Sequence, residues 1–541
     1  MGAVVSVAAR AAANTAASAA ANVEASTGAN AAASVALQRV RLARQAARLA
    51  RQVARPARQA ASAVPPLAGA VSKRRRPAST ADDAPPRAAG ARTSADNLFG
   101  MPNFPDAPAE GAPASAREPK PERGLWRLLG PAFVASIAYV DPGNVAANLS
   151  AGAEYGYLLV WVLVVANAMA VLIQYLSAKL GLVTGRSLPE LLGERLSRWP
   201  RIAYWVQAEL VAAATDVAEV VGGAIALNLL FDIPLVWGGA ITGVISMVLL
   251  LVHTRRGQQP FEFVIIGFLA IIAAGFLAGL FVSPVDWADA AGGIVPRFGD
   301  SGTVLLAASM LGATVMPHAI YLHSSLSRDR HLPAFRADGR AEVGDPLQAL
   351  LDADDHQRRL PRLLRATKVD VFYSLVIAGS VNVAMLLLAA AALPGVDGTD
   401  TIEGAHRAIE DALGPGIGVI FAVGLLASGL AATSVGAYAG AIIMGGLIHK
   451  RIPLLVRRLV TIVPALVILA WGLDPTRALV LSQVLLSLGI PFALIPLVRL
   501  TSSRLIMGRY AASRALSAVA WLVVGLIIGL NVALIVITCA T

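Results

Sequence analysis

The chain has a single cysteine in 541 residues and few charged residues for its length. The lone thiol, at Cys539, excludes a disulfide framework and any cluster of cysteines around a metal. Charged residues make up 15% of the chain, whereas a soluble globular protein contains about 25%. The composition therefore argues against one compact soluble domain.

Apolar residues make up 56% of the chain and occur in blocks of roughly 20, the length that crosses the hydrocarbon core of a bilayer. We expect an all-α membrane protein with eleven transmembrane helices. They are delimited at residues 127–153, 157–182, 202–230, 234–252, 262–283, 302–326, 368–393, 416–447, 456–472, 477–498 and 515–538.

Residues 1–118 differ from the rest because they are rich in Ala, Arg and Pro, with a basic cluster at residues 73–76. This composition favours a disordered low-complexity tail in front of a transmembrane domain at residues 119–541. Two alternatives remain open. The Arg-containing stretch at 35–60 could form a basic amphipathic helix on an anionic membrane surface, or translation could begin at Met101. No apolar signal-peptide segment precedes a small-residue cleavage site.

The formal charge of +11 suggests nucleic acid only at first sight, because the basic residues lie in the tail and in alternate loops. The basic loops fall at residues 186–201, 255–256, 328–368, 450–458 and 499–514, all on the side of the tail. The other loops carry acids: Glu154, Asp232, Asp286, Asp289, Asp397, Asp400, Glu403 and Asp411. The positive-inside rule then predicts a multi-pass protein of the cell membrane, with a cytoplasmic N-terminus and an extracellular C-terminus. Its partner is the lipid bilayer, not nucleic acid.

Two of the predicted spans contain residues that break helices. Span 1 includes Asp141-Pro142-Gly143-Asn144, and span 6 includes residues 312–318, with Pro317 near the end. Proline removes a backbone donor and clashes with the preceding turn, and irregular backbone at membrane depth needs a buried or cavity-lining position. Each break lies in the first helix of a five-span set, at 127–283 and 302–498. Because five is an odd number, the two sets should have opposite orientations in the membrane and form an inverted repeat. Paired breaks in such repeats mark the substrate sites of transporters.

The residues around the breaks suit a transition-metal ion. Asp141 offers a carboxylate, Asn144 an amide oxygen, and unwinding frees backbone carbonyls near Ala138 and Ala313. The thioether of Met316 favours softer ions than Mg²⁺ or Ca²⁺. We therefore predict a site for Mn²⁺ or Fe²⁺. Simple helix kinks are the alternative, but they leave the charged Asp141 in mid-membrane unexplained.

A second set of charged residues suits proton transfer. Asp216 and Glu219 are three residues apart in span 3, hence on one face of the helix. Either Arg457 or Arg458, at the start of span 9, is expected to neutralise the pair. A switchable ion pair of this kind is compatible with a place at the far end of a proton route.

Four further polar residues lie in or beside the apolar spans. His318 follows the second break, where it either relays protons towards Asp216 or braces the unwound segment. His323 is about 140° further around the helix, so the two histidines cannot readily share a metal. Asp370 and Asn382, in span 7, are expected to hydrogen-bond between helices, with Asn382 near the unwound regions.

Four segments resemble the signatures of the Nramp metal-ion transporters, in order and with the expected spacing. They are Ser136–Asn144 (SIAYVDPGN), Gln174–Gly181 (QYLSAKLG), Ala313–His318 (ATVMPH) and Leu481–Ser487 (LSQVLLS). The resemblance covers residues 124 to about 538 and leaves out the tail.

The resemblance implies an inverted-repeat fold of the leucine-transporter type and proton-coupled import of Mn²⁺ or Fe²⁺ by alternating access. The implied metal ligands are Asp141, Asn144, Met316 and the Ala313 carbonyl. The implied proton residues are Asp141, His318, Asp216 and Glu219 with Arg457 or Arg458 as their partner. Gln483 would approach the metal in an occluded state, and Met316 sets the chain apart from magnesium-transporting relatives. The chain departs from the family pattern at Ala441 and Gly489, where Gln is usual, and at Ile462, where Arg is usual.

Two other functions fit these residues less well than metal transport does. An amino-acid transporter of the same fold would aim helix N-termini at a carboxylate, which Asp141 would repel. A membrane-embedded metal enzyme would need more strong ligands, an activated water and a base. One carboxylate with weak neutral ligands suits reversible binding better. We therefore predict a transporter, not an enzyme, in which the metal is substrate and no cofactor is required.

Overall fold

The computed structural model describes residues 130–331 and 346–540, apart from 395, 397, 400 and 451. Within these residues the chain is almost entirely helical and contains no strand. The predicted tail at 1–118 and the first residues of the predicted membrane domain lie outside the described residues.

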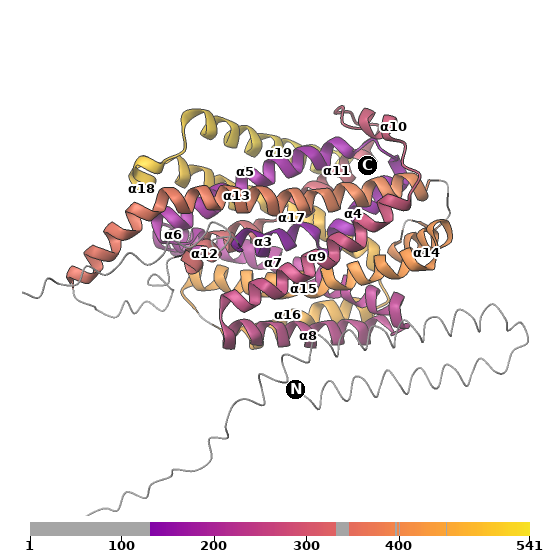
Figure 1. The fold of residues 1–541 in the computed structure, drawn as a ribbon, viewed down its shortest axis with the longest axis horizontal. Coiled ribbons are helices and arrows are strands. Elements are labelled where there is room, and N and C mark those ends of the chain that lie inside the picture. Colours follow the sequence, from indigo (N-terminus) through magenta and orange to yellow (C-terminus); the bar gives the residue numbers. More distant parts are fainter. Residues whose placement is uncertain are drawn as a thin grey trace, which may run out of the picture. The chain divides into compact units, whose positions relative to one another are not determined.

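The helices run along one common direction, with the connecting helices at the two ends (Figure 1). The first half contains α3 (Pro131–Ser136), the 3₁₀ helix η2 (Ile137–Val140), α4 (Pro142–Tyr155), α5 (Val160–Thr184), α6 (Leu188–Arg195), α7 (Arg198–Phe231), α8 (Leu235–Arg256), α9 (Gln258–Val282) and α10 (Trp287–Gly292). The second half contains α11 (Ser301–Thr314), α12 (Pro317–His331), α13 (Pro346–Ala392), α14 (Ile402–Leu413), α15 (Pro415–Ile448), α16 (Leu454–Ala470), α17 (Pro475–Ser502), α18 (Arg504–Met507), η4 (Gly508–Tyr510) and α19 (Arg514–Ala540).

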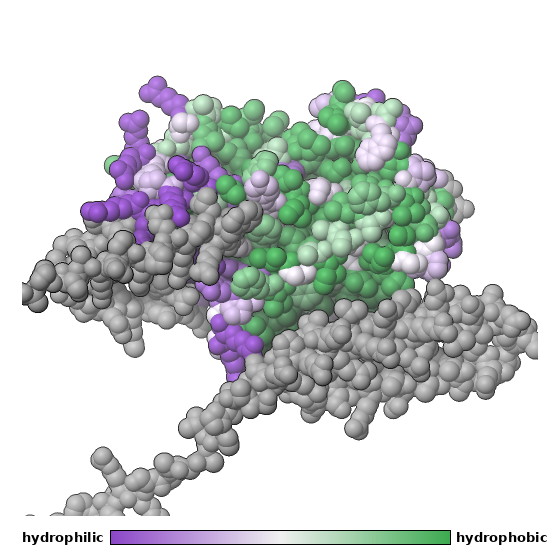
Figure 2. Space-filling view, viewed as in Figure 1, coloured by the Kyte–Doolittle hydropathy of each residue, from purple (hydrophilic) through white to green (hydrophobic). Residues whose placement is uncertain are grey.

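The described helices fit a membrane protein. Nine of them are long and apolar enough to span a bilayer, with α11 and α12 counted as one, and residues 131–140 form a shorter apolar helix. Hydrophobic side chains cover the middle of the bundle and hydrophilic ones gather at its ends (Figure 2). The all-α membrane class is thus confirmed. The count of eleven stays a prediction, since α16 has 17 residues and the first span is divided.

The seventh predicted span lies within a longer helix. It was expected to start at residue 368, whereas α13 is helical from Pro346 and its candidate span starts at His356. Charged residues at 355–368 mark the N-terminal limit of the apolar block, but they do not interrupt the helix, because Arg, Lys and Gln are good helix formers. The loops predicted after spans 2 and 7 also contain short helices, α6 and α14.

Helix packing repeats between the two sets of five spans. Helices at the same position in the two sets pack on each other: α5 on α13, α7 on α15, and α8 on α16. Contacts between different positions also occur twice, with the two sets exchanged. The contact of α4 with α13 corresponds to that of α12 with α5, that of α9 with α15 to that of α17 with α7, and that of α3 with α9 to that of α11 with α17. This pattern agrees with a five-plus-five repeat; the opposite orientation of the sets stays a prediction.

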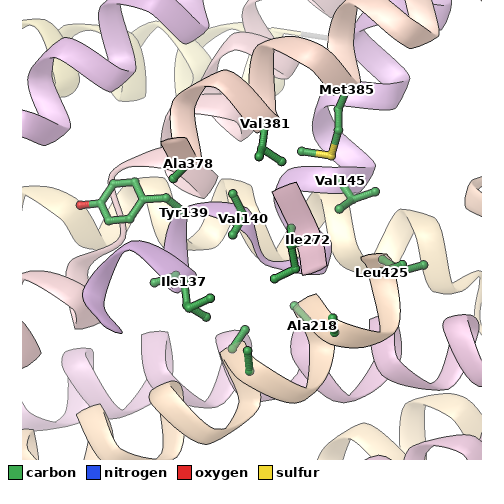
Figure 3. Close-up of a cluster of buried hydrophobic side chains, with 14 of the residues drawn as sticks. Ile137, Tyr139, Val140, Val145, Ala218, Ile272, Ala378, Val381, Met385 and Leu425 are labelled. Carbon is green, nitrogen blue, oxygen red and sulfur yellow. The ribbon is translucent and has the colours of Figure 1, made fainter. Parts of the chain in front are cut away.

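The largest apolar cluster surrounds the first interrupted helix (Figure 3). Ile137, Tyr139 and Val140 of η2 lie among side chains from several helices. These are Val145 of α4, Ala218 of α7, Ile272 of α9, Ala378, Val381 and Met385 of α13, and Leu425 of α15. The unwound segment is therefore enclosed by packed hydrocarbon, where every backbone polar group needs a partner from the protein.

Two of the helix crossings depend on glycine. A Cβ added to Gly181 of α5 would lie 2.0 Å from the backbone oxygen of Ser324 in α12. One added to Gly152 of α4 would lie 2.5 Å from the oxygen of Leu386 in α13. These distances are shorter than any carbon–oxygen contact, so the backbones approach this closely only because no side chain lies between them.

The substitution Gly181→Ala should separate α5 from α12 and lower stability by about 1–3 kcal/mol, the usual cost of overpacking. Thermal unfolding of the purified protein in detergent would measure the loss. Gly267→Ala is the matched control, because a Cβ there meets nothing within 4 Å and alanine favours the helix. Equal melting temperatures for the two variants would contradict the close approach of α5 and α12.

Candidate functional site

The first interruption is built by the sequence Asp-Pro-Gly-Asn. Asp141 leaves helical geometry with φ −71° and ψ 168°, and its carboxylate accepts from the backbone N–H of Asn144 at 2.9 Å. Pro142 occupies the first position of α4, where its missing N–H costs nothing. Asp141 is therefore the N-cap of α4, and its charge faces the positive end of that helix.

The second interruption separates α11 from α12. Helix α11 ends at Thr314, Val315 adopts φ −108° and ψ 71°, and α12 begins at Pro317. Both interruptions fall inside the segments where proline predicts them. The carbonyls at the C-terminal ends of η2 and α11 lack partners within their own helices, and they carry the negative ends of two helix dipoles.

The two interruptions meet at one atom. The Asn144 amide nitrogen Nδ2 donates to the Asp141 carboxylate oxygen Oδ1 at 2.7 Å and to the Ala313 carbonyl at 2.9 Å. The Asn144 oxygen Oδ1 is buried and has no hydrogen-bond partner among the described residues. A carboxylate and a carbonyl from different halves of the chain thus converge within ligand-like reach of one point. An amide flip would add the Asn144 oxygen to them.

Met316 lies in the second interruption and is fully buried. It belongs to the same apolar cluster as Ala138, Tyr139 and Val140 of the first interruption. The described residues contain no group of three His, Cys, Asp or Glu side chains placed to hold a metal. The candidate ligands are therefore one carboxylate, neutral oxygens and a sulfur.

Gln483 of α17 contacts both interruptions. Its Nε2 lies 3.5 Å from Asp141 Oδ2. A Cβ added to Gly143 would fall 1.7 Å from that nitrogen, and one added to Gly312 would fall 2.1 Å from the backbone oxygen of Gln483. Glycine at both positions lets α17 approach the two breaks, and it places Gln483 beside the carboxylate as the resemblance implies.

The backbone carbonyls of the first break accept from other helices. Asn382 of α13 donates to the Tyr139 oxygen at 2.7 Å, and Ser428 of α15 donates to the Val140 oxygen at 2.5 Å. Asn148 of α4 in turn donates to Asn382 at 3.1 Å. The position of Asn382 was predicted. Ser428 was missed, because a serine in an apolar helix gives no signal of its partner.

The arginine that faces Asp216 is Arg458. The Arg458 Nη1 lies 3.0 Å from Asp216 Oδ1, and both side chains are at most 1% exposed. The contact is an ion pair without hydrogen-bond geometry, since neither Asp216 oxygen has a hydrogen-bond partner within the part of the chain that the structure describes. The Arg458 Nε donates to Ser246 of α8 at 3.0 Å. Three helices, α7, α8 and α16, therefore hold the pair.

Glu219 and His318 flank this ion pair. Glu219 is buried against α15, where a Cβ on Gly436 would lie 2.8 Å from its Oε2. That oxygen lacks a hydrogen-bond partner among the residues described. His318 Nδ1 lies 3.5 Å from the hydroxyl of Thr215, the residue before Asp216. Its Nε2 has no hydrogen-bond partner in the described residues. His318 thus lies between the second interruption and the turn of α7 that carries Asp216.

Arg457 pairs with a different acid, Glu209 of α7, by a short contact from Nη2 to Oε1. The sequence analysis did not name Glu209. It lies seven residues before Asp216 and hence on the same helix face, a spacing that could have found it. Helix α7 therefore carries a line of three acids, two of which are paired with adjacent arginines.

Two other polar residues singled out in the sequence, Asp370 and His323, hold helices together. Asp370 accepts from the backbone N–H groups of Gly130 and Ala132, at 3.1 and 3.0 Å, and so caps the start of α3. His323 lies 2.8 Å from Gln174 through Nδ1, and Gln174 donates to the Tyr139 hydroxyl at 2.5 Å. His318 and His323 therefore have separate partners.

Comparison with known proteins identifies the family. The model for "Natural resistance-associated macrophage protein-like" (Nramp) matches residues 132–537. The chain belongs to this family. The divalent metal cation transporter MntH of Mycobacterium tuberculosis strain H37Rv is 58% identical over 413 residues, 76% of this chain and 92% of that protein. The divalent metal cation transporter MntH of Deinococcus radiodurans is 43% identical over 418 residues, which cover 76% of this chain and 90% of that protein.

A solved structure also agrees with the Nramp fold. The manganese transporter of Eremococcus coleocola, crystallised with an aromatic bis-isothiourea compound, superposes with a TM-score of 0.65 at 30% identity. The alignment covers 75% of this chain and 85% of that one. The Nramp relatives are named as transporters, in agreement with the prediction that the chain is not an enzyme.

The substitution Arg458→Met should destabilise the protein by about 3–5 kcal/mol, because it leaves the Asp216 charge buried and unpaired. Thermal unfolding would measure this, and adding Asp216→Asn should restore part of the loss. Arg477→Met is the control, since Arg477 is 81% exposed and its contact with Asp474 is 3.6 Å, a pair worth under about 1 kcal/mol. A double variant as unstable as Arg458→Met alone would contradict the ion-pair argument.

Proposed function

We propose that this Nramp protein imports divalent transition-metal ions, Mn²⁺ first and Fe²⁺ as well, together with protons. The observation that carries the proposal is the convergence of the Asp141 carboxylate and the Ala313 carbonyl on one point between two interrupted helices. Relatives named divalent metal cation transporters and a structure named a manganese transporter support the substrate class.

The proposed ligands are Asp141, Asn144, Met316 and the Ala313 carbonyl, with Gln483 joining when the site is closed. The Asn144 amide now donates to both acceptors that a cation would bind. If the amide flips, its oxygen, which has no hydrogen-bond partner among the described residues, takes the place of the nitrogen and can bind the cation. One carboxylate and neutral donors neutralise only part of a divalent charge, and this favours release as well as binding.

Selectivity in this proposal comes from Met316. Mg²⁺ and Ca²⁺ bind oxygen ligands and hold water strongly, so a thioether gives them little. Softer transition metals gain from sulfur. Because Met316 is buried in the second interruption, an ion at the Asp141–Ala313 point would need to lose water on the side of the sulfur. That loss is offset for Mn²⁺ or Fe²⁺ and much less for Mg²⁺.

The proposed proton route leads away from the metal along α7. It starts at Asp141, passes His318, which lies against Thr215, and reaches the Asp216–Arg458 pair beside Glu219. The Arg457–Glu209 pair lies two turns further along the same helix. Arrival of a divalent cation would displace a proton from Asp141, and proton and metal would then leave by different paths. The titration belongs to the coupled set and not to one residue.

Alternating access is the proposed mode of transport. Exchanged helix contacts between two sets of five helices allow two related packings of one set against the other. A membrane potential negative inside contributes about 2.3 kcal/mol per charge for each 100 mV. Cation entry would therefore run towards the cytoplasm, the side on which the positive-inside rule places the basic loops.

Vesicles reconstituted with the chain should take up Mn²⁺ faster when the outside is acidic, and Asp141→Ala should reduce uptake to that of empty vesicles. The reason is that this substitution removes the only charged ligand and the first proton acceptor. Asp411→Ala is the control, because Asp411 is an exposed carboxylate of α14. Uptake by Asp141→Ala at the control rate, or uptake indifferent to the pH gradient, would sink the proposal.

Met316→Ala should let Mg²⁺ and Ca²⁺ compete with Mn²⁺, which they should not do in the unaltered protein. Competition in proteoliposomes measures this, with Cd²⁺ as the soft-metal comparison. Met385→Ala is a matched control, because Met385 is buried in the same apolar cluster but belongs to α13 and to neither interrupted segment. Discrimination unchanged by Met316→Ala, or lost equally in Met385→Ala, would count against the role of the sulfur.

A further inference from the structure

Two lysines from different helices converge on one aromatic ring outside the proposed transport site. Lys179 of α5 has its ammonium nitrogen 5.9 Å from the centre of the Tyr175 ring, and Lys368 of α13 has its own 5.4 Å from the same centre. Cation–π attraction operates at these distances. The two like charges repel each other across the ring, so attraction to the ring alone does not explain why both ammonium groups gather there.

Lys179 differs from the other buried cations of the described residues. Arg328 pairs with Glu190 and Asp329, Arg457 with Glu209, and Arg458 with Asp216. Lys179 is only 7% exposed, yet among the described residues neither it nor Lys368 has a hydrogen bond or an ion pair. The Lys179 ammonium is not among the atoms that are fully buried without a partner, so an anion from outside can reach it. Two cations with little exposed surface and no counter-charge among the described residues favour such an anion.

The location of the lysines indicates what that anion is. Lys179 lies five residues before the end of α5, about 7–8 Å along the helix from Thr184. Phe372, one turn after Lys368 on α13, and its neighbour Tyr373 are both 54% exposed, as aromatic side chains are at a membrane interface. This end of the bundle carries the basic loops, and the leaflet there is the one rich in anionic lipid.

We propose that Lys179, Lys368 and Tyr175 form a binding site for the phosphate of an anionic phospholipid headgroup. Lysine binds phosphate as a point charge, and its long apolar stem lets it reach from the hydrocarbon region to the headgroups. Lys368 is exposed on the outer surface of α13, so a lipid reaches the site laterally. The acyl chains then lie along the exposed aromatic pair, Phe372 and Tyr373.

The bound lipid would join α5 to α13. These helices are the second members of the two five-helix sets, and they pack against each other. Beyond the lysines, towards the end of the bundle, Leu182 of α5 meets Leu360, Leu363 and Leu364 of α13. A phosphate between Lys179 and Lys368 replaces repulsion by attraction at this contact. The lipid therefore stabilises the helix pair, whatever the protein transports.

The test compares thermal unfolding of the full-length protein in neutral detergent with added phosphatidylglycerol or phosphatidylcholine of the same chains. Phosphatidylglycerol should raise the melting temperature by about 2–4 °C more than phosphatidylcholine does. Lys179→Gln/Lys368→Gln should abolish this difference, and Lys179→Arg/Lys368→Arg should keep it. Lys450→Gln is the control, because Lys450 is an exposed lysine at another basic loop and should keep the full difference.

Three outcomes would overturn the site. The first is a full phosphatidylglycerol effect in the double glutamine variant. The second is an equal loss in Lys450→Gln, which would mean that anionic lipid acts through total charge. The third is the same stabilisation by soluble glycerol phosphate, which would mean a site for a free anion. If the double variant does not fold, Lys368→Glu replaces it, because that position is exposed and the reversed charge should still remove the difference.

Discussion

The structure depends on satisfying backbone carbonyls where two helices are interrupted inside packed hydrocarbon. Each such carbonyl, left without a donor, would cost several kcal/mol. Donors from three helices solve this: Asn382 binds the Tyr139 oxygen, Ser428 the Val140 oxygen and Asn144 the Ala313 oxygen. The breaks can therefore exist only where α4, α13 and α15 bring these side chains. The same arrangement leaves acceptors directed at one point, so the proposed cation site is a consequence of how the breaks are held.

Close packing around the breaks completes that arrangement. Gly143 and Gly312 admit α17 to van der Waals distance of both interruptions, and Gln483 then lies beside the Asp141 carboxylate. A larger residue at either glycine would push α17 away and open the enclosure. Pro142 and Asp141 play the local part, since they start α4 at this depth without an unpaired donor. Local sequence thus decides where each helix stops, and the neighbouring helices decide what the freed groups meet.

The positions of the spans and of the two interruptions could be predicted from the sequence, because they depend on local residue patterns. Apolar blocks locate the spans, and Asp-Pro-Gly-Asn and Met-Pro-His locate both interruptions. Ser428 could not be predicted, since its partner depends on how α15 crosses η2. The choice of Arg458 over Arg457 depends on the rotation of α16, because adjacent residues of a helix point about 100° apart. Glu209 was within reach, seven residues from Asp216. The start of α13 could not be read from the apolar block, because charged residues can end a membrane span without ending its helix.

One rule, charge neutrality in a low dielectric, connects the interior with the membrane edge. Inside the bundle the protein supplies both signs: Arg458 faces Asp216 and Arg457 faces Glu209. Asp141 has no such cation, only amide donors from Asn144 and Gln483, and this is the condition for a carboxylate that must exchange its counter-ion. Lys179 presents the opposite case at the lipid boundary. In the proposed lipid site a fixed partner would be redundant, because a headgroup phosphate would supply the negative charge, whereas Asp216 is only 1% exposed. Buried arginines thus neutralise Asp216 and Glu209, whereas Asp141 and Lys179 are left for a substrate ion and a lipid phosphate to neutralise.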